Sequence, residues 1–452
     1  MNRPATQHKR VTYPAYKPSG VEWLGDVPSM WSVTRLRFQV KINPVKSELR
    51  GIPEDTSVSF VPMEAVGEYG GLRLEQAHAL EDVANGYTYF RDGDVVVAKI
   101  TPCFENGKGS IADGLENGIG FGTTELHVLR PSSSMDRNYL FYLTISHAFR
   151  KIGASYMYGA GGQKRVPDTF IRDFRHPIPT TNEQISIAAF LDGETARIDA
   201  LIEKKRRQIE LLKEKRSALI SHAVTKGLEP NAPMKDSGIE WLREIPAHWE
   251  AKRLRFLVSE PLKYGANESA ELDDPALPRY IRITDVDENG RLREDTFKSL
   301  PEDVARAYLL KEGDLLLARS GATVGKSFYY DPSWGCAAYA GYLIRARFNP
   351  VRVMPRFVNY FTNSLQYWWW LGSSFIQATI QNVSAEKYAN LIVPVPPVDE
   401  QAEIVAYLDG MWKRLNDLTR KIKGSIEQLM DYRTALISAA VTGKIDVHKE
   451  VS

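Results

Sequence analysis

The sequence predicts an α+β fold in which two mixed α/β domains are joined by two long helices. These helices are expected to pair as an antiparallel coiled coil, so that the molecule has a pseudo-two-fold internal repeat. Two observations predict this fold. The chain of 452 residues contains the same head and tail sequences twice, and both tails carry apolar residues at helical spacing.

The duplication is clearest at the heads of the two repeats. Residues 19–38 read SGVEWLGDVPSMWSVTRLRF and return at 237–256 as SGIEWLREIPAHWEAKRLRF, with 11 of 20 positions identical. The tails also match, because residues 178–225 align with 395–442 and both end in ALIS-x-AVT. The chain is therefore a tandem repeat with conserved ends.

Each tail predicts a long, uninterrupted helix. Pro179 and Pro396 precede Asn182 and Asp399, which are good N-cap residues. About 44 residues without proline give a rod of about 65 Å, too long to bury its apolar stripe in one small domain. We therefore expect the two helices to pack against each other; the alternative is that each packs only on its own domain. The apolar stripe is predicted to contain Ile187, Leu191, Ile198, Leu201, Ile209, Leu212 and Leu219, matched by Ile404, Leu408, Leu415, Leu418, Ile426, Leu429 and Leu436.

The centres of the repeats diverge but keep a few landmarks. Both contain strand-like runs around GDVVVAK (93–99) and GDLLLAR (313–319), and both continue into an aromatic helical segment. These patterns predict two related α/β domains. The predicted parts are an N-terminal extension (1–18), a first domain (19–178), a first helix (179–228), a linker (229–236), a second domain (237–395), a second helix (396–446) and a C-terminal tail (447–452).

The composition indicates a globular chain and excludes several classes of protein. The net charge is only +2, so any nucleic-acid surface must be a local basic patch. Cys103 and Cys336 lie far apart without neighbouring metal ligands, which favours a reducing compartment. The start MNRPATQHKR has no apolar run, and no segment is apolar enough to span a membrane. We expect a cytoplasmic protein without membrane association.

No catalytic or cofactor motif is evident in the sequence. The segment GATVGKS (321–327) has three residues between the first glycine and GK, whereas a phosphate-binding loop needs four. The histidines are scattered, and no metal cluster or nucleophile motif is present. We therefore expect a chain that is not itself an enzyme and binds no cofactor.

Two diverged domains on paired helices suit a linear ligand that carries two different recognition elements at a fixed separation. Duplex DNA is the strongest candidate, because its recognition elements repeat along an axis and their spacing is set by the geometry of the protein.

The sequence resembles the specificity subunit of type I restriction–modification systems. The resemblance rests on SG(V/I)EWL…P…W at each head, the GD-apolar-A-(K/R) strand, and the P…EQ…LD…ALI…AVT tail, and it covers essentially the whole chain. It implies that each centre is a target-recognition domain reading one half of a bipartite, asymmetric DNA site. It further implies that the helices set the gap and dock two methyltransferase (modification) subunits, with restriction/translocase subunits added for cleavage, and that the chain has no catalytic site.

Candidate DNA contacts lie at the landmarks shared by the two repeats. Basic side chains there are suited to phosphate or guanine, while glutamine and asparagine pair with adenine. The second loop lacks the basic pair of the first, and each candidate also has an ordinary surface role as its alternative. The candidates are Lys99, Lys108, Gln163, Lys164, Arg165, Arg319, Lys326, Gln381 and Asn382.

Two other functions fit parts of the pattern. One is a coiled-coil scaffold that spaces two protein-interaction modules unrelated to DNA. The other is a self-sufficient enzyme with an unrecognised site. Sequence-dependent and salt-dependent binding to DNA separates the first of these from a specificity subunit.

Overall fold

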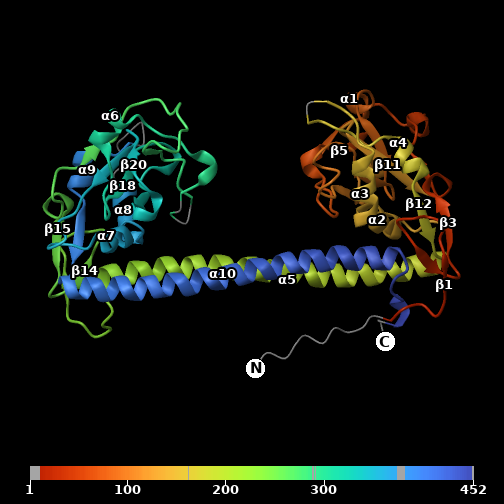
Figure 1. Cartoon of the computed structure of the whole chain (residues 1–452). Helices are drawn as coiled ribbons and strands as arrows, with labels where there is room; N and C mark the ends of the chain where they lie inside the picture. Colours follow the sequence, from red (N-terminus) through yellow and green to blue (C-terminus); the bar gives the residue numbers. More distant parts are fainter. Residues whose placement is uncertain (1–10, 161, 288–289, 291, 374–381, 450–452) are drawn as a thin grey trace. The chain divides into compact units, whose positions relative to one another are not determined.

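The computed structural model describes residues 11–160, 162–287, 290, 292–373 and 382–449. The chain divides into two compact units. Unit 1 contains residues up to Lys205 together with those from Gly424 onward, and unit 2 runs from Arg206 to Lys423. Each unit thus holds one α/β domain and a segment of both long helices (Figure 1).

Unit 1 is built on two four-stranded sheets. In the first sheet, β5 and β10 are parallel and the other neighbours are antiparallel; the second sheet is antiparallel throughout. The first sheet has the order β6 (Gln76–Ala79), β5 (Ser57–Val61), β10 (Ile119–Gly122), β7 (Thr88–Arg91). The second has the order β4 (Val40–Ile42), β11 (Leu126–Pro131), β8 (Val95–Ala98), β9 (Gly109–Ile111). The remaining elements are the pairs β1 (Tyr16–Pro18) with β2 (Asp26–Pro28) and β3 (Ser32–Arg35) with β12 (Arg175–Ile178), and the helices α1 (Leu80–Val83), α2 (Arg137–Ile145), α3 (His147–Ser155) and α4 (Asp168–Asp173).

Unit 2 repeats this topology with fewer strands among the described residues. Its four-stranded antiparallel sheet and its parallel pair correspond to the second sheet and the β5–β10 pair of unit 1. The sheet has the order β16 (Lys263–Tyr264), β21 (Leu343–Ala346), β18 (Leu315–Ala318), β19 (Ser327–Tyr329), and the parallel pair is β17 (Arg279–Ile281) with β20 (Ala337–Tyr339). The remaining elements are the pairs β13 (Met234–Asp236) with β14 (Glu244–Pro246) and β15 (Glu250–Arg253) with β22 (Ile392–Val395), and the helices α6 (Glu302–Ala305), α7 (Pro355–Phe361), α8 (Leu365–Ser373) and α9 (Ala385–Ala389).

The two tails form the long helices α5 (Thr181–Lys226) and α10 (Val398–Val441). In unit 1 the start of α5 packs against the end of α10, and in unit 2 the end of α5 packs against the start of α10. The pairing is therefore antiparallel, as predicted. Asn182 and Asp399, expected as N-caps, lie inside the first turn of each helix.

One part of the predicted apolar stripe is wrong. Leu201 and Leu418 are exposed, whereas Ile202 and Ile422 are buried. The stripe follows the alternating spacing of four and three residues that a paired helix requires, and this spacing places Ile202 rather than Leu201 at the contact.

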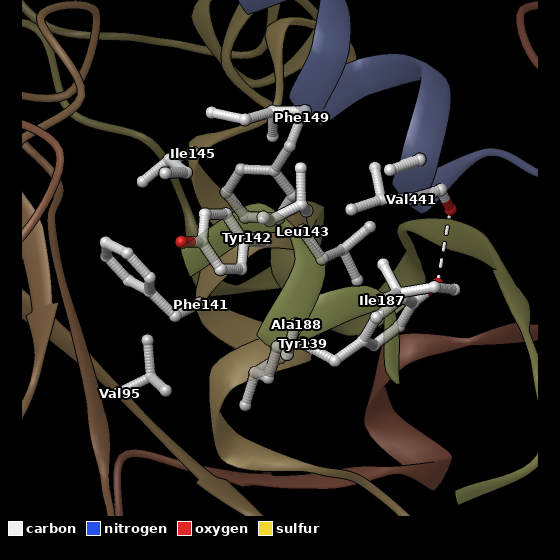
Figure 2. Packing of buried hydrophobic residues seen from close by; sticks show 14 of the residues in the cluster. Val95, Tyr139, Phe141, Tyr142, Leu143, Ile145, Phe149, Ile187, Ala188 and Val441 are labelled. Atoms are coloured by element: carbon white, nitrogen blue, oxygen red, sulfur yellow. Dashed lines mark hydrogen bonds between the residues drawn. The ribbon is translucent and has the colours of Figure 1, made fainter. Parts of the chain in front are cut away.

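The ends of the helices are also part of the domain cores. In unit 1, Ile187 of α5 and Val441 of α10 pack with Tyr139 and Phe149 from α2 and α3 (Figure 2). The Tyr139 hydroxyl donates to the carbonyl of Val441 at 3.2 Å. Each helix end therefore packs on a domain as well as on the other helix, so the alternative of helices that pack only on their own domains is not what the structure shows.

The conserved heads close over the ends of the helices. In unit 1 the Lys444 ammonium donates to the carbonyl oxygens of Leu24 (3.1 Å) and Asp26 (2.6 Å), and in unit 2 Lys226 donates to the carbonyl of Glu244 at 2.7 Å. These lysines follow or precede glycines with positive φ, which end the helices. Each head therefore caps the tail of the other repeat, which explains why heads and tails stayed alike.

A buried histidine makes the stability of unit 1 sensitive to acid. Burial lowers the pKa of His176 in β12 to about 4, from an ordinary value of 6.5. As the pH falls, the unfolded chain binds a proton at His176 before the folded chain does. The stability that depends on neutral His176 is therefore complete above pH 6.5 and is lost as the pH falls toward 4. The equivalent position in β22 of unit 2 is the buried Val393.

We predict that His176→Val removes this dependence. Between pH 7 and pH 4 the free energy of unfolding of the variant should rise relative to the wild type by about 3 kcal/mol. Urea unfolding of unit 1 at a series of pH values measures it. Replacing the exposed His78 by Gln is the matched control, and an equal pH slope in wild type and His176→Val would contradict the assignment.

Candidate functional site

The candidate residues of unit 1 surround the end of β8. The carbonyl of Lys99 accepts from the backbone N–H of Val166 at 2.8 Å, and the N–H of Ala98 donates to the carbonyl of Lys108 at 3.1 Å. The N–H of Thr101 donates to the carbonyl of Lys164 at 2.9 Å. Two loops far apart in the sequence are thus held at one strand end. Gathered there are Lys99, Lys108, Gln163, Lys164 and Arg165.

Their side chains differ in availability. Arg165 makes a fork with Glu125, with Nε–Oε2 and Nη2–Oε1 distances of 2.9 and 2.8 Å, and this hydrogen bonding lowers the pKa of Glu125. Lys108 donates to the carbonyl of Met63 at 3.1 Å. Gln163 and Lys164 are exposed. A DNA contact by Arg165 therefore has to compete with Glu125, whereas Gln163 and Lys164 face solvent directly.

Unit 2 holds its candidates in the same backbone arrangement. The carbonyl of Arg319 accepts from the N–H of Val383 at 2.8 Å, and the N–H of Ala318 donates to the carbonyl of Lys326 at 2.9 Å. The Arg319 guanidinium lies 4.7 Å from the Tyr264 ring centroid, and its Nε is 3.4 Å from Oδ1 of Asn382. Arg319, Lys326 and Asn382 thus meet at the end of β18. Gln381 lies outside the described residues.

The GD landmark has a structural role that the sequence did not reveal. Asp94 accepts from the N–H of Arg91 at 2.9 Å and forms a buried fork with Arg130 of β11, at 2.6 and 2.8 Å. In unit 2, Asp314 pairs with Arg347 at 2.8 and 2.6 Å. The aspartate ties the turn before β8 or β18 to an arginine on or just after the neighbouring strand, so it fixes where β8 or β18 begins. In the sequence, the only sign of this role is that the aspartate recurs in both repeats.

A second carboxylate completes each of these clusters. Glu48 contacts Arg130, and Glu260 accepts from Arg347 at 2.9 Å. Hydrogen bonds from Lys41 and then from Arg130 lower the pKa of Glu48 to about 2. The paired charges therefore stay ionised near neutral pH.

Each long helix also carries an arginine in its apolar stripe, which sequence inspection missed. In unit 1, Arg433 pairs with Asp199 (Nε–Oδ1 3.1 Å) and lies 4.9 Å from the Tyr69 ring centroid. The backbone N–H of Tyr69 donates to the carbonyl of Gly107 at 3.1 Å, next to Lys108. The paired helices thus contact the hairpin that supports a candidate DNA loop.

The equivalent arginine of unit 2 borders a cavity. Arg216 stacks on Trp412 at 3.3 Å from the ring centroid. Both line a cavity of about 850 Å³ that also reaches Lys326, Trp334 and Trp368. In both units, therefore, the stripe arginine lies beside the glycine–lysine loop that follows β8 or β18.

Metal and membrane features were sought throughout the described part of the chain. No group of three or more histidine, cysteine, aspartate or glutamate side chains there is placed to hold a metal ion. None of the helices in the described residues is both long and apolar enough to cross a bilayer.

Two related α/β units, each presenting polar loops at one strand end and each closed over an antiparallel helix pair, define an internally duplicated protein with two equivalent candidate sites. The family comparison agrees. Residues 81–211 and 267–428 match the family model described as the Type I restriction modification DNA specificity domain. These segments make up more than half of the chain, so the chain belongs to this family.

Several proteins similar to this chain are named as specificity subunits. It is 42% identical over 161 residues to the EcoAI specificity subunit of Escherichia coli, which is 35% of this chain and 27% of that one. It is 24% identical over 450 residues to the putative MjaX specificity subunit of Methanocaldococcus jannaschii, covering 94% of this chain and 96% of that one. A solved chain from work on assembly and conformational transition of the type I R-M system has a TM-score of 0.73 at 17% identity, covering 92% and 98%, and shares the fold.

The buried aspartates of the GD turns should be essential for stability. Asp94→Asn and Asp314→Asn each leave a partly buried arginine with a single carboxylate, and we expect a loss of about 3 kcal/mol in the unfolding of the affected unit. Asp113→Asn removes an exposed pair with Arg137 and should cost under about 1 kcal/mol. Urea denaturation gives both values, and near-neutral Asp94→Asn and Asp314→Asn would contradict the proposed role.

Proposed function

We propose that this chain is the DNA-specificity subunit of a type I restriction–modification complex, in which each unit reads one half of a bipartite, asymmetric site. The observation that carries the proposal is the equivalence of the two strand ends. The bonds Val166 N–H to Lys99 and Val383 N–H to Arg319 hold the same loops in both units, while the side chains on those loops differ. One scaffold with unlike side chains suits two unlike half-sites.

The side chains at these strand ends match the chemistry of DNA. Lys99 and Lys164 supply cations for phosphates, and Gln163 has the amide that pairs with an adenine edge. In unit 2, Arg319 and Asn382 offer guanine-type and adenine-type contacts. The second strand end has fewer cations among the described residues, so the two half-sites are bound by different balances of phosphate and base contacts.

The helix pair is proposed to act as the spacer and as the dock for partners. Two methyltransferase (modification) subunits bind along it, and restriction/translocase subunits join for cleavage, all in the cytoplasm. The chain itself then supplies recognition and no chemistry, while the methyltransferase subunits bind the S-adenosylmethionine.

Selection from a pool of random duplexes tests this function. The purified chain, alone and with a methyltransferase subunit, should enrich a two-part motif with a fixed gap, and its affinity should fall steeply with salt. The chain alone with S-adenosylmethionine should leave DNA unmodified. A coiled-coil scaffold unrelated to DNA would show neither enrichment nor salt dependence, and methylation by the chain alone would identify an enzyme.

Lengthening the helix pair should lengthen the gap between half-sites. In unit 1, Asp199 faces Arg433, so Glu203 lies opposite Leu429 in the antiparallel pair. Seven residues inserted after Glu203 and seven after Gln428 add about 10 Å while keeping the heptad register. At about 3.4 Å per base pair, the gap should grow by about three base pairs with both half-sites unchanged.

The control places the same seven residues in the linker 229–236, outside both helices. That insertion should leave the gap as it is, because loop insertions cost little and do not separate the helix ends. The selected motifs of the two variants give the comparison. An unchanged gap in the helix variant would show that the helices do not set the spacing.

A further inference from the structure

One corner of each head is exposed and yet identical in the two repeats. Arg35, Arg37 and Phe38 of unit 1 return as Arg253, Arg255 and Phe256 of unit 2, and all six are exposed. Five other positions that are exposed in both heads changed after the duplication, whereas Gly20 and Glu22 recur as Gly238 and Glu240. The changed pairs are Gly25/Arg243, Asp26/Glu244, Ser29/Ala247, Met30/His248 and Ser32/Glu250.

The fold does not account for this identity. Leu36 and Leu254, in the middle of the motif, are buried in the core, which explains their recurrence. The two phenylalanines, by contrast, are 66% and 53% exposed and gain little from folding. Their recurrence therefore needs another cause.

Internal ion pairs do not account for the arginines either. In unit 1, Arg35 and Arg37 contact Asp173 at 3.5 and 3.2 Å. The equivalent position in unit 2 is Asn390, and within the described residues Arg253 and Arg255 make no ion pair. The arginines recur although their carboxylate partner does not, so that carboxylate is not what retained them.

The corner has the same shape in both units. The Arg37 guanidinium lies 5.3 Å from the Phe38 ring centroid, and Arg255 lies 4.9 Å from that of Phe256. In unit 2 a cavity of about 420 Å³ adjoins the corner, lined by Arg255 and by apolar side chains that include Val258, Leu262 and Ala385. Each unit thus presents a cation stacked on an exposed ring, and unit 2 adds an apolar hollow beside it.

We propose that this Arg–Phe corner is a docking surface for one kind of protein partner, bound once at each unit. A surface kept identical in two diverging repeats meets the same ligand twice, whereas the half-sites of DNA differ. Its cations favour carboxylates on the partner, its exposed ring favours an apolar recess, and the hollow in unit 2 favours a protruding apolar side chain. The partner assignment rests on the proposed function: it is the methyltransferase subunit, in two copies, each of which contacts a corner in addition to the helix pair.

The surroundings favour protein over the DNA backbone. In unit 2 the apolar side chains beside Arg255, which include Val258 and Leu262, offer nothing to a phosphate. An exposed phenylalanine gains from an apolar protein recess and gains nothing from a phosphate. Aromatic and arginine side chains are also the residues that dominate the binding energy of protein interfaces.

Truncation of the ring tests the surface. Phe38→Ala, Phe256→Ala and the double variant are mixed with the purified methyltransferase subunit, and the number of bound copies is measured by native mass spectrometry and sedimentation. The wild type should bind two copies. Each single variant should bind one copy with unchanged affinity and the other at least tenfold more weakly, and the double variant should bind neither at the same concentration.

Met30→Ala is the matched control, because Met30 is 71% exposed in the same head and did not recur. Thermal unfolding checks that all variants fold. Arg37→Glu should weaken binding of the copy that Phe38→Ala weakens. Arg255→Glu should weaken binding of the copy that Phe256→Ala weakens. Two tightly bound copies in every variant would overturn the corner as a docking surface.

DNA binding by the chain alone separates the remaining outcomes. The affinity of Arg37→Glu and Arg255→Glu for the selected duplex, and its salt slope, should equal those of the wild type. A lower salt slope with two partners still bound would mean that the corner contacts phosphates, and the proposal would fall. A wild type that recruits no methyltransferase subunit would instead overturn the proposed function, and the partner assignment with it.

Discussion

The packing of a long apolar stripe governs the architecture. A helix of 46 residues cannot bury its stripe on one small domain, and in this chain each helix begins in the core of one unit and ends in the core of the other. Ile187 packs with the core of unit 1, and Ile220 and Val224 of the same helix pack with that of unit 2. Neither unit is therefore complete without helix segments from both repeats.

This exchange of helix ends explains which parts of the sequence could diverge. A head has to fit the tail of the other repeat, so a change in Trp31 or in the Gly443–Lys444 turn would disturb a contact between repeats. Among the described residues, the loops at the ends of β8 and β18 bond to strands of their own unit, and their sequences differ between the repeats. Constant ends and variable centres follow from packing, and they leave the strand-end loops open to selection by a ligand.

The sequence predicted the repeat, the helices and the strand ends because each leaves a local, periodic signal. It failed where the outcome depends on partners in space. Leu201 and Ile202 are equally apolar, and only the facing helix decides which is buried. Arg165 looked like a free base-reading side chain, but its fork with Glu125 joins residues 40 positions apart. The pairing of Asp94 with Arg130 across two strands was hidden for the same reason.

The stripe arginines link the helix pair to the loops that carry the candidate DNA contacts. A cation in an apolar seam costs stability unless it is paired, and Arg433 is paired with Asp199 across the helices and stacked near Tyr69. Tyr69 in turn is bonded to the loop that bears Lys108. The side chain that interrupts the seam thus also supports the loop that bears Lys108. The proposed function requires the spacing helices and the candidate DNA loops to be fixed to one support, and in unit 1 this arginine connects them.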